Sequence, residues 1–145
     1  MSEVSEEEMK GRKRKPRVPA SFVGERLVIG ELLRRGFEAQ LANFGPRKHG
    51  LLIRGGDSPP KLIQVKTVHS TPWYVRQASF AGSVANQVTV YVLLGIEGSA
   101  KSARFFLVKN SDLAAQFRQP SNWKALRFID AKTVKKYENN WDILR

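Results

Sequence analysis

The chain has 145 residues, with 25 Lys and Arg against 13 Asp and Glu, so its formal charge is +12 and 41% of its residues are hydrophobic. This is enough apolar material for one globular domain, and the charge excludes an acidic solvating segment. No apolar run is long enough for a membrane span, the opening residues are acidic rather than signal-like, and cysteine is absent. We therefore expect a cytoplasmic, nucleoid-associated protein, or a nuclear one in a eukaryote.

Most of the positive charge belongs to the part of the chain that is predicted to fold. Residues 1–19 lack hydrophobic periodicity and contain two prolines, so we predict a disordered charged tail followed by one domain over residues 20–145. The first 20 residues hold six Lys and Arg against four Glu, which leaves a charge of +10 for residues 21–145. A domain this basic is expected to meet a polyanion, most often nucleic acid. The alternative is an evenly solvated basic surface.

The hydrophobic pattern predicts an α/β order of elements. A helix is expected from Phe22 to Arg35, because apolar residues recur there at helical spacing and Gly36 follows two arginines. Strands are expected at Phe37–Leu41, Leu51–Arg54, Lys61–Thr67, Val88–Leu94, Arg104–Val108 and Leu126–Ile129. Further helices are expected over Tyr74–Ala85, from an Asn110 or Ser111 cap to Phe117, and over Ala131–Tyr137 after an Asp130 cap. The predicted fold is a single α/β domain with a central mixed β-sheet flanked by helices.

The strand predicted at Lys61–Thr67 is interrupted by polar residues. By the two-residue period of a strand, Gln64 and Lys66 project from one face. They follow a helix that carries Glu25 and a two-strand hairpin. This ordered combination resembles the PD-(D/E)XK superfamily of restriction-endonuclease-like nucleases, and especially its small junction-resolvase-like members. The resemblance covers about residues 21–95 and implies an αβββαβ core with C-terminal additions.

The resemblance also implies roles for individual residues. In that superfamily a helix carboxylate, an Asp of the second strand and a Glu or Gln of the third strand gather a divalent metal, and the lysine orients or activates the attacking water. Carried over to this chain, Glu25, Gln64 and the carbonyl of Val65 would hold Mg²⁺. The catalytic group would be Glu25, Gln64 and Lys66.

One acid of this set is missing from the sequence. The position that matches the second-strand Asp is Gly50, or His49 if the register shifts by one, and neither is a carboxylate. Asp57 is the nearest acid, but it lies in the hairpin turn, too far along the strand to reach Gln64. A single carboxylate with an amide and a backbone carbonyl is a weak Mg²⁺ site. We therefore expect weak Mg²⁺ binding and incomplete catalysis.

The register of the hairpin decides what His49 does. If the hairpin closes by pairing Arg54 with Lys61, His49 comes to the face of the predicted site. It would then lie opposite Lys66, where an imidazole would act as a base or bind a softer metal. A one-residue slip would put Gly50 on that face instead, and His49 would be an ordinary loop residue.

Basic and aromatic residues flank the predicted site. Arg47, Lys48 and His49 precede the second strand of the hairpin, while Trp73 and Arg76 follow the strand that carries the lysine. We predict that these five residues contact phosphates or stack on bases. The alternative for Trp73 is packing over the edge of the sheet.

Two further features are predicted to be structural. Gly24 lies inside a helix, where glycine is unfavourable, so we expect a tight contact between this helix and the sheet. Tyr137, Trp141 and Leu144 recur at helical spacing and are predicted to pack on the core if the last helix continues that far.

The leading hypothesis is a DNA-binding protein with a nuclease-like core that lacks full metal-dependent catalysis. Its partner would be duplex or branched DNA rather than a membrane, and a homodimer is an open alternative. A second hypothesis is an active Mg²⁺-dependent endonuclease or resolvase-like phosphodiesterase that uses Glu25, Gln64 and Lys66. A third is a structural subunit of an assembly.

Overall fold

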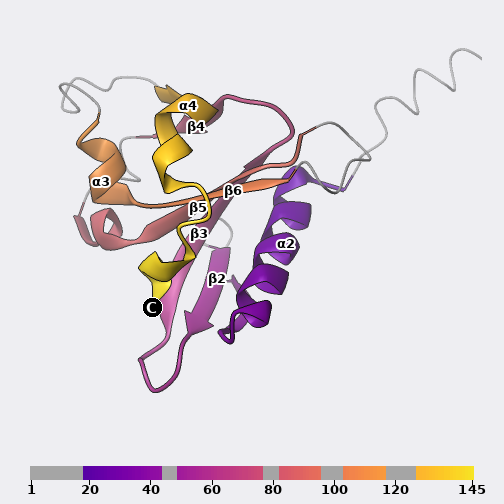
Figure 1. The fold of residues 1–145 in the computed structure, drawn as a ribbon, viewed down its shortest axis with the longest axis vertical. Coiled ribbons are helices and arrows are strands. Elements are labelled where there is room, and N and C mark those ends of the chain that lie inside the picture. The colour runs from indigo at the N-terminus through magenta and orange to yellow at the C-terminus, as the bar shows by residue number, and fades with distance from the viewer. Residues whose placement is uncertain (1–17, 44–48, 77–81, 96–102, 117–126) are drawn as a thin grey trace, which may run out of the picture.

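The computed structural model describes residues 18–43, 49–76, 82–95, 103–116 and 127–145. In this part of the chain, five strands form one mixed sheet in the order β1-β2-β3-β5-β6, and two short strands, β4 and β7, pair separately. Helix α2 lies along one side of the sheet, while α3, α4 and β4 lie on the other side (Figure 1). The expected α/β fold, a single mixed sheet flanked by helices, is confirmed.

Helix α2 (Ala20–Arg34) is the predicted first helix, extended by two residues at its start. It ends at Arg34, and the predicted glycine stop follows at Gly36, which has φ of 89°. Phe37 N then donates to the carbonyl of Leu32 at 3.0 Å. One stripe of the helix faces the sheet, and its buried residues are Gly24, Glu25, Val28 and Leu32.

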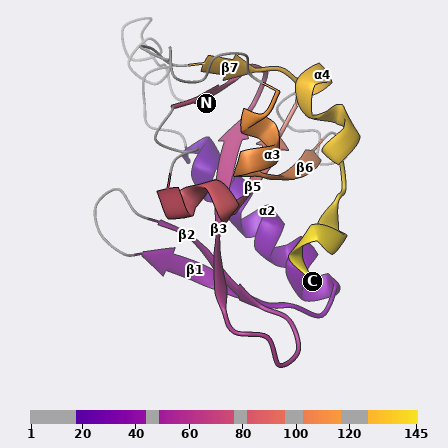
Figure 2. The ribbon, with the colours of Figure 1, turned by 90° about the vertical axis from the view of Figure 1, so that its left-hand side faces the viewer.

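The main sheet contains β1 (Glu38–Asn43), β2 (His49–Arg54), β3 (Lys61–Val68), β5 (Val88–Leu93) and β6 (Arg104–Lys109). β1, β2 and β3 form an antiparallel meander, β5 runs parallel to β3, and β6 returns antiparallel to β5. The first five residues of β5 are buried, as its β-branched run predicts for a strand covered on both faces. In Figure 2 the hairpin of β2 and β3 extends away from the rest of the fold.

A second, small sheet replaces part of the helix that was predicted over Tyr74–Ala85. This segment begins within β4 (Trp73–Val75) and ends within the 3₁₀ helix η2 (Gly82–Asn86), with residues 77–81 outside the described part. The partner of β4 is β7 (Arg127–Ile129), which lies far away in the sequence. A strand of three residues with such a distant partner leaves almost no local pattern, so this prediction was wrong.

The C-terminal part is built from short helical pieces. These are α3 (Asn110–Ala114), α4 (Ala131–Val134), η5 (Lys135–Tyr137) and η6 (Trp141–Leu144). The predicted Asp130 cap is confirmed, because its carboxylate accepts a hydrogen bond of 2.9 Å from Thr133 N. No helix among the described residues is long and apolar enough to cross a bilayer.

The predicted cap of α3 was wrong. Lys109 occupies the N-cap position without a side-chain hydrogen bond. Asn110 is instead buried inside the fold, where its amide donates to the carbonyl of Val84 at 2.9 Å and its oxygen accepts from Thr89 at 2.7 Å. Its side chain joins three segments of the fold rather than ending a helix.

Two apolar clusters fill the two sides of the sheet. The first lies under α2 and includes Val28, Leu51, Ile63, Val90, Trp141 and Leu144. The second lies under β4, β7, α3 and α4 and includes Trp73, Tyr91, Phe106, Leu113, Ile129 and Val134. Trp141 and Leu144 pack on the core as predicted, but without a continuous helix, because Asn139 with φ of 57° interrupts the chain before them.

Candidate nucleic-acid interface

The pairing of β2 with β3 decides which residues lie beside the polar positions of β3. Ile53, rather than Arg54, is the partner of Lys61. The register that would set His49 opposite Lys66 is therefore wrong by one residue. The observed register is the alternative one, which is shifted by one residue and brings Gly50 rather than His49 to the face of Gln64 and Lys66.

Gly50 lies beside Gln64, at a point with no room for a side chain. A Cβ atom on Gly50 would collide with the carbonyl oxygen of Ile63 and would lie 3.5 Å from Nε2 of Gln64. The backbones of β2 and β3 thus approach closely where the resemblance requires an aspartate. The glycine is needed for this approach, so a carboxylate here would demand a shift of the backbone.

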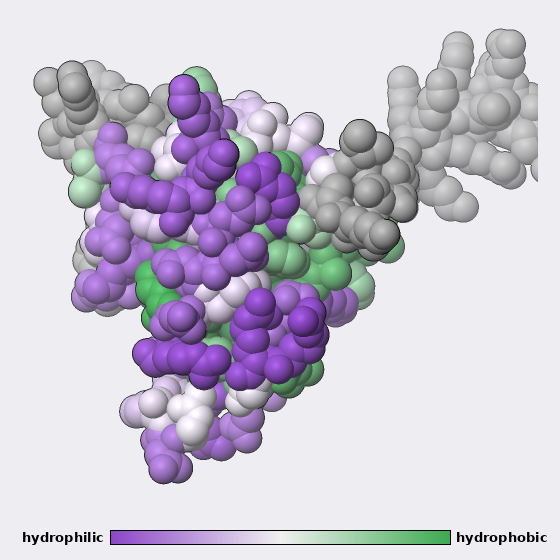
Figure 3. All heavy atoms as spheres, in the orientation of Figure 1, coloured by the Kyte–Doolittle hydropathy of each residue, from purple (hydrophilic) through white to green (hydrophobic). Residues whose placement is uncertain are grey.

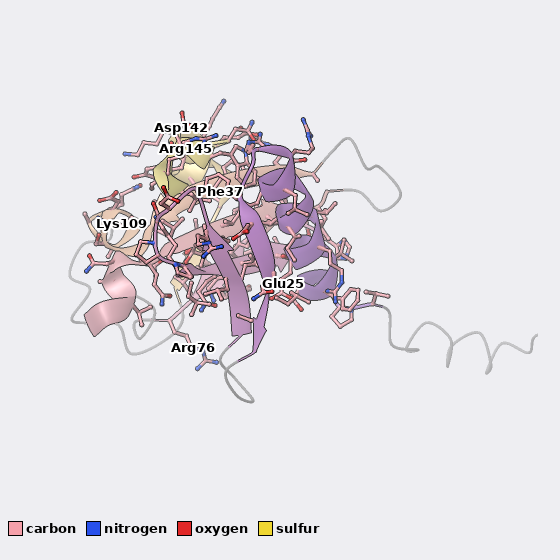
Figure 4. All side chains as sticks on the ribbon, turned by 90° about the horizontal axis from the view of Figure 1, so that it is seen from below. Glu25, Phe37, Arg76, Lys109, Asp142 and Arg145 are labelled. Atoms are coloured by element: carbon pink, nitrogen blue, oxygen red, sulfur yellow. The ribbon has the colours of Figure 1, made fainter. Side chains whose placement is uncertain are left out.

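Helix α2 contacts β3 on the face opposite to Lys66. Gly24 packs on Thr67 so closely that a Cβ atom there would lie 2.7 Å from Cβ of Thr67. The tight contact predicted for this glycine is confirmed. Glu25 follows it on the buried side of the helix with 8% exposure, and Figure 4 shows it between α2 and the strands. Because Thr67 and Lys66 point to opposite faces, Glu25 and Lys66 approach β3 from opposite sides.

Lys66 is half-buried on the second face of the sheet. Its partner in β5 is Tyr91, which is 1% exposed and packs against the edge of Trp73. Burial lowers the pKa of Lys66, and the positive charge of Arg76 lowers this pKa further. A carboxylate partner would raise the pKa of a lysine instead. The surroundings of Lys66 are therefore apolar and positively charged.

Arg76 supplies the second cation of this site. It directly follows β4 and is exposed. Figure 4 shows it extending from the outside of the fold, well apart from Glu25. Its charge nevertheless acts on Lys66. Lys66 is thus half-buried, and Arg76 adds an exposed positive charge that acts on it.

Trp73 is a core residue, so its prediction as a nucleic-acid contact was wrong. It is 1% exposed, its Nε1 donates to the carbonyl of Val92 at 3.1 Å, and its ring packs edge-on against Tyr91 and Phe106. A buried ring has no free face for a base. The side chain that β4 does present to solvent is Tyr74, 58% exposed. Because side chains alternate between the two faces of a strand, a buried Trp73 would have indicated that Tyr74 is exposed.

Three predicted contacts are not placed by the structure. Arg47 and Lys48 lie outside the described residues, and so does the side chain of His49. The backbone of His49 begins β2. On this face, the structure therefore describes three of the candidate side chains, those of Gln64, Lys66 and Arg76.

The described residues do not fit the divalent metal that the resemblance implies. Among them, no three Asp, Glu or His side chains come together in a group that would hold a metal ion. The position beside Gln64 is closed to a carboxylate by the backbone contact of Gly50. The causes that shift the pKa of Lys66 include no carboxylate. Glu25, Gln64 and the carbonyl of Val65 alone offer too few anionic oxygens for Mg²⁺.

The described residues form a basic α/β domain with one five-stranded mixed sheet, and a glycine rather than an acid lies beside Gln64. The sequence matches no family model and no curated protein sequence. Among solved structures, the chain is similar to Hjc, a Holliday junction resolvase of the hyperthermophilic archaeon Archaeoglobus fulgidus, with a TM-score of 0.48 and 18% identity. The similarity covers 79% of this chain and 92% of the resolvase. Function is therefore inferred from the residues of the site itself.

Proposed function

We propose that the chain binds duplex or branched DNA through the face that carries Gln64, Lys66 and Arg76, and that it lacks full metal-dependent catalysis. The observation that supports this most is the electrostatic state of Lys66, whose pKa is lowered by burial and by Arg76. A phosphate oxygen placed between the two cations would supply the negative charge that the site lacks. Such contacts release counterions and provide most of the affinity of proteins for nucleic acid.

The carboxylates elsewhere in the described residues support this assignment. Most of them already have partners within the molecule: Glu31 pairs with Arg34 and Arg35, Glu38 with Arg54, Glu138 with Arg104 and Asp142 with Arg145. None of these ion pairs includes Lys66 or Arg76. With a charge of +12 for the chain, the surplus of cations is available to an external polyanion.

Phosphodiester hydrolysis is the alternative function, and Glu25 is the observation that favours it. This carboxylate is 8% exposed on the face of α2 that packs on β3. Carboxylates are almost never fully buried unless they are paired or coordinate a metal. A lysine with a lowered pKa, as in Lys66, is also the better proton acceptor. In this alternative the missing acid would come from outside the described residues.

The DNA-binding proposal is tested by the salt dependence of affinity. We expect the full chain to bind duplex and four-way-junction DNA with an affinity that falls linearly on a log–log plot against salt. Lys66→Ala should weaken binding and reduce the slope by about one, because one phosphate contact is lost. Arg54→Ala is the matched control, since it removes the same charge from an exposed pair with Glu38 at the far end of β2. It should leave the slope unchanged.

Two results would contradict the proposal. One is a wild-type affinity that is absent or independent of salt. The other is an equal loss for Lys66→Ala and Arg54→Ala. The same DNA substrates incubated with Mg²⁺ or Mn²⁺ should remain uncut. Cleavage that disappears in both Glu25→Gln and Lys66→Ala would establish the hydrolytic alternative in its place.

A further inference from the structure

The small sheet of β4 and β7 exposes two aromatic side chains directly opposite each other. Tyr74 and Phe128 are partners in this antiparallel pair. Tyr74 is 58% exposed and Phe128 is 69% exposed. Side chains opposite each other on one face of an antiparallel pair have neighbouring Cβ atoms, so the two side chains start side by side on the exposed face.

The opposite face of the small sheet, by contrast, is buried against the core. Trp73 and Ile129, which are partners in the next position, are 1% and 0% exposed, and Val75 is 0% exposed. The small sheet is therefore held firmly on the core by its inner face. Single exposed apolar residues are ordinary, but an exposed pair of rings on a rigid support is a candidate binding surface.

Exposed cations follow each of the two aromatic residues in the sequence. Arg76 is exposed and lies two residues after Tyr74, about 6.6 Å along an extended chain. On the other strand, the exposed lysines Lys132, Lys135 and Lys136 follow Phe128 on α4 and η5. The face over α4 and the C-terminal segment is largely hydrophilic (Figure 3).

The carboxylates next to these lysines are already engaged. Asp130 accepts two hydrogen bonds from Thr133, and Glu138 pairs with Arg104. Exposed rings with cations close by in the chain are complementary to a nucleotide, whose base offers a π face and whose phosphate offers a negative charge.

We propose that Tyr74 and Phe128 form a stacking platform for unpaired bases. The proposal rests on the proposed DNA binding and adds to it a substrate class, namely DNA in which a duplex adjoins unpaired nucleotides. Lys66 and Arg76 contact the phosphates, and the strand then leads over Tyr74 and Phe128, where its bases stack. Stacking is tolerant of sequence, because every base has a π face.

The test compares two DNA ligands by fluorescence anisotropy at one salt concentration. One ligand is a blunt duplex, and the other is the same duplex with a single-stranded tail of thymidines. The wild-type chain should bind the tailed DNA more tightly. Tyr74→Leu with Phe128→Leu keeps the apolar bulk but removes both rings, and it should weaken binding to tailed DNA by about 10-fold or more while blunt-duplex affinity stays within about 2-fold. Leu33→Ala with Leu41→Ala is the control, because these leucines are also exposed, at 54% and 45%, but lie on α2 and β1.

The outcomes separate this proposal from the DNA binding on which it rests. Duplex binding without any preference for the tail, or a leucine variant that binds both ligands like the wild type, overturns the platform alone. Tail binding without duplex binding overturns the Lys66 interface and supports the platform. Binding to neither ligand contradicts both. A wild-type dimer in solution that the leucine variant abolishes would show that a second copy covers the rings, which also overturns the platform.

A second readout does not depend on the stability of the double variant. Phe128→Trp places a fluorescent ring on the platform, and oligothymidine should quench its emission when bases stack on it. Leu33→Trp is the control and should show no quenching. Equal quenching in both variants, or none in either, would contradict the proposal.

Discussion

Two cations on the same face of the central sheet differ in how their charge is balanced. Arg104 begins β6, and its guanidinium donates hydrogen bonds of 2.9 Å to both carboxylate oxygens of Glu138, which raises the pKa of Arg104. Lys66 of β3 has no such partner among the described residues, and burial and the charge of Arg76 lower its pKa. The first cation is balanced inside the molecule and serves the fold. The charge of the second is disfavoured by burial and by Arg76, and the proposed DNA interface is centred on it.

The largest expected effect concerns Trp73, the core residue that packs against Tyr91, the partner of Lys66 in β5. Trp73→Ala should destabilise the protein by about 3–5 kcal/mol, because it empties a fully buried site between Tyr91 and Phe106. Trp73→Phe loses mainly the hydrogen bond to Val92 O and should cost about 1 kcal/mol. Urea denaturation measures both. Trp73→Phe should keep wild-type DNA affinity, and a large loss of affinity in this folded variant would restore Trp73 as a base contact.

The next effect concerns the absent acid beside Gln64. Gly50→Ala should destabilise by about 1–3 kcal/mol, since its Cβ would overlap with the carbonyl of Ile63. Gly30→Ala is the matched control, because nothing lies within 4 Å of a Cβ there, and it should stabilise α2 by up to about 1 kcal/mol. Gly50→Asp should also be destabilised and should gain no Mg²⁺ binding by calorimetry. A stable Gly50→Asp that binds Mg²⁺ would mean that only the carboxylate was missing.

A smaller effect is expected for the ion pair of Arg104 and Glu138. The hydrogen bonds from Arg104 lower the pKa of Glu138 below its ordinary 4.5 in the folded state. The pair therefore stabilises the fold above about pH 4.5, and this contribution is lost as the pH falls through the lowered pKa. Because both side chains are partly exposed, Glu138→Gln should cost about 1 kcal/mol or less at pH 7. The difference from wild type should shrink toward pH 2 in urea titrations, and a constant difference would contradict this assignment.

The smallest effect is expected at Lys66 itself. The lowered pKa of Lys66 means that folding disfavours its charged form. At a pH below the pKa of Lys66 in the folded state, the buried charge therefore lowers the stability of the protein. This loss of stability disappears as the pH rises toward 10.5, the ordinary pKa of a lysine. Lys66→Met should therefore be slightly more stable than wild type at pH 7, and this gain should decrease as the pH rises toward 10.5. Urea midpoints over this range provide the measurement. A variant that is less stable at pH 7 would show an internal partner for the lysine.

The fold was largely predictable because its main elements carry local signals. The β-branched run that became β5 and the glycine stop at Gly36 both indicate their structure without help from distant residues. β7 (Arg127–Ile129) falls within the strand that was predicted at Leu126–Ile129. β4 was not predicted, since it has three residues and finds its partner across the chain. The pairing of Tyr74 with Phe128 on one exposed face was missed for the same reason.

The site was predictable in part. The alternation of β3 indicated correctly that Lys66 lies on the face opposite to Thr67. The hairpin register was uncertain by one residue, because Arg54 and Ile53 are both plausible partners of Lys61 from sequence alone. A register shift of one residue decides whether His49 or Gly50 lies on the sheet face of Gln64 and Lys66. The structural role of Gly50 also depends on the distance between two backbones, which no residue pattern reveals.

The most direct test of the central claim is the pKa of the Lys66 amine measured by NMR, with Lys66→Arg to assign the signal, in the free chain and with a saturating DNA duplex. We predict a value below the ordinary 10.5 in the free chain, and a rise when phosphate oxygens approach the amine. A value at or above 10.5 without DNA would reveal an internal carboxylate partner. A lowered value that DNA leaves unchanged would place the phosphates elsewhere, and either result would contradict the account.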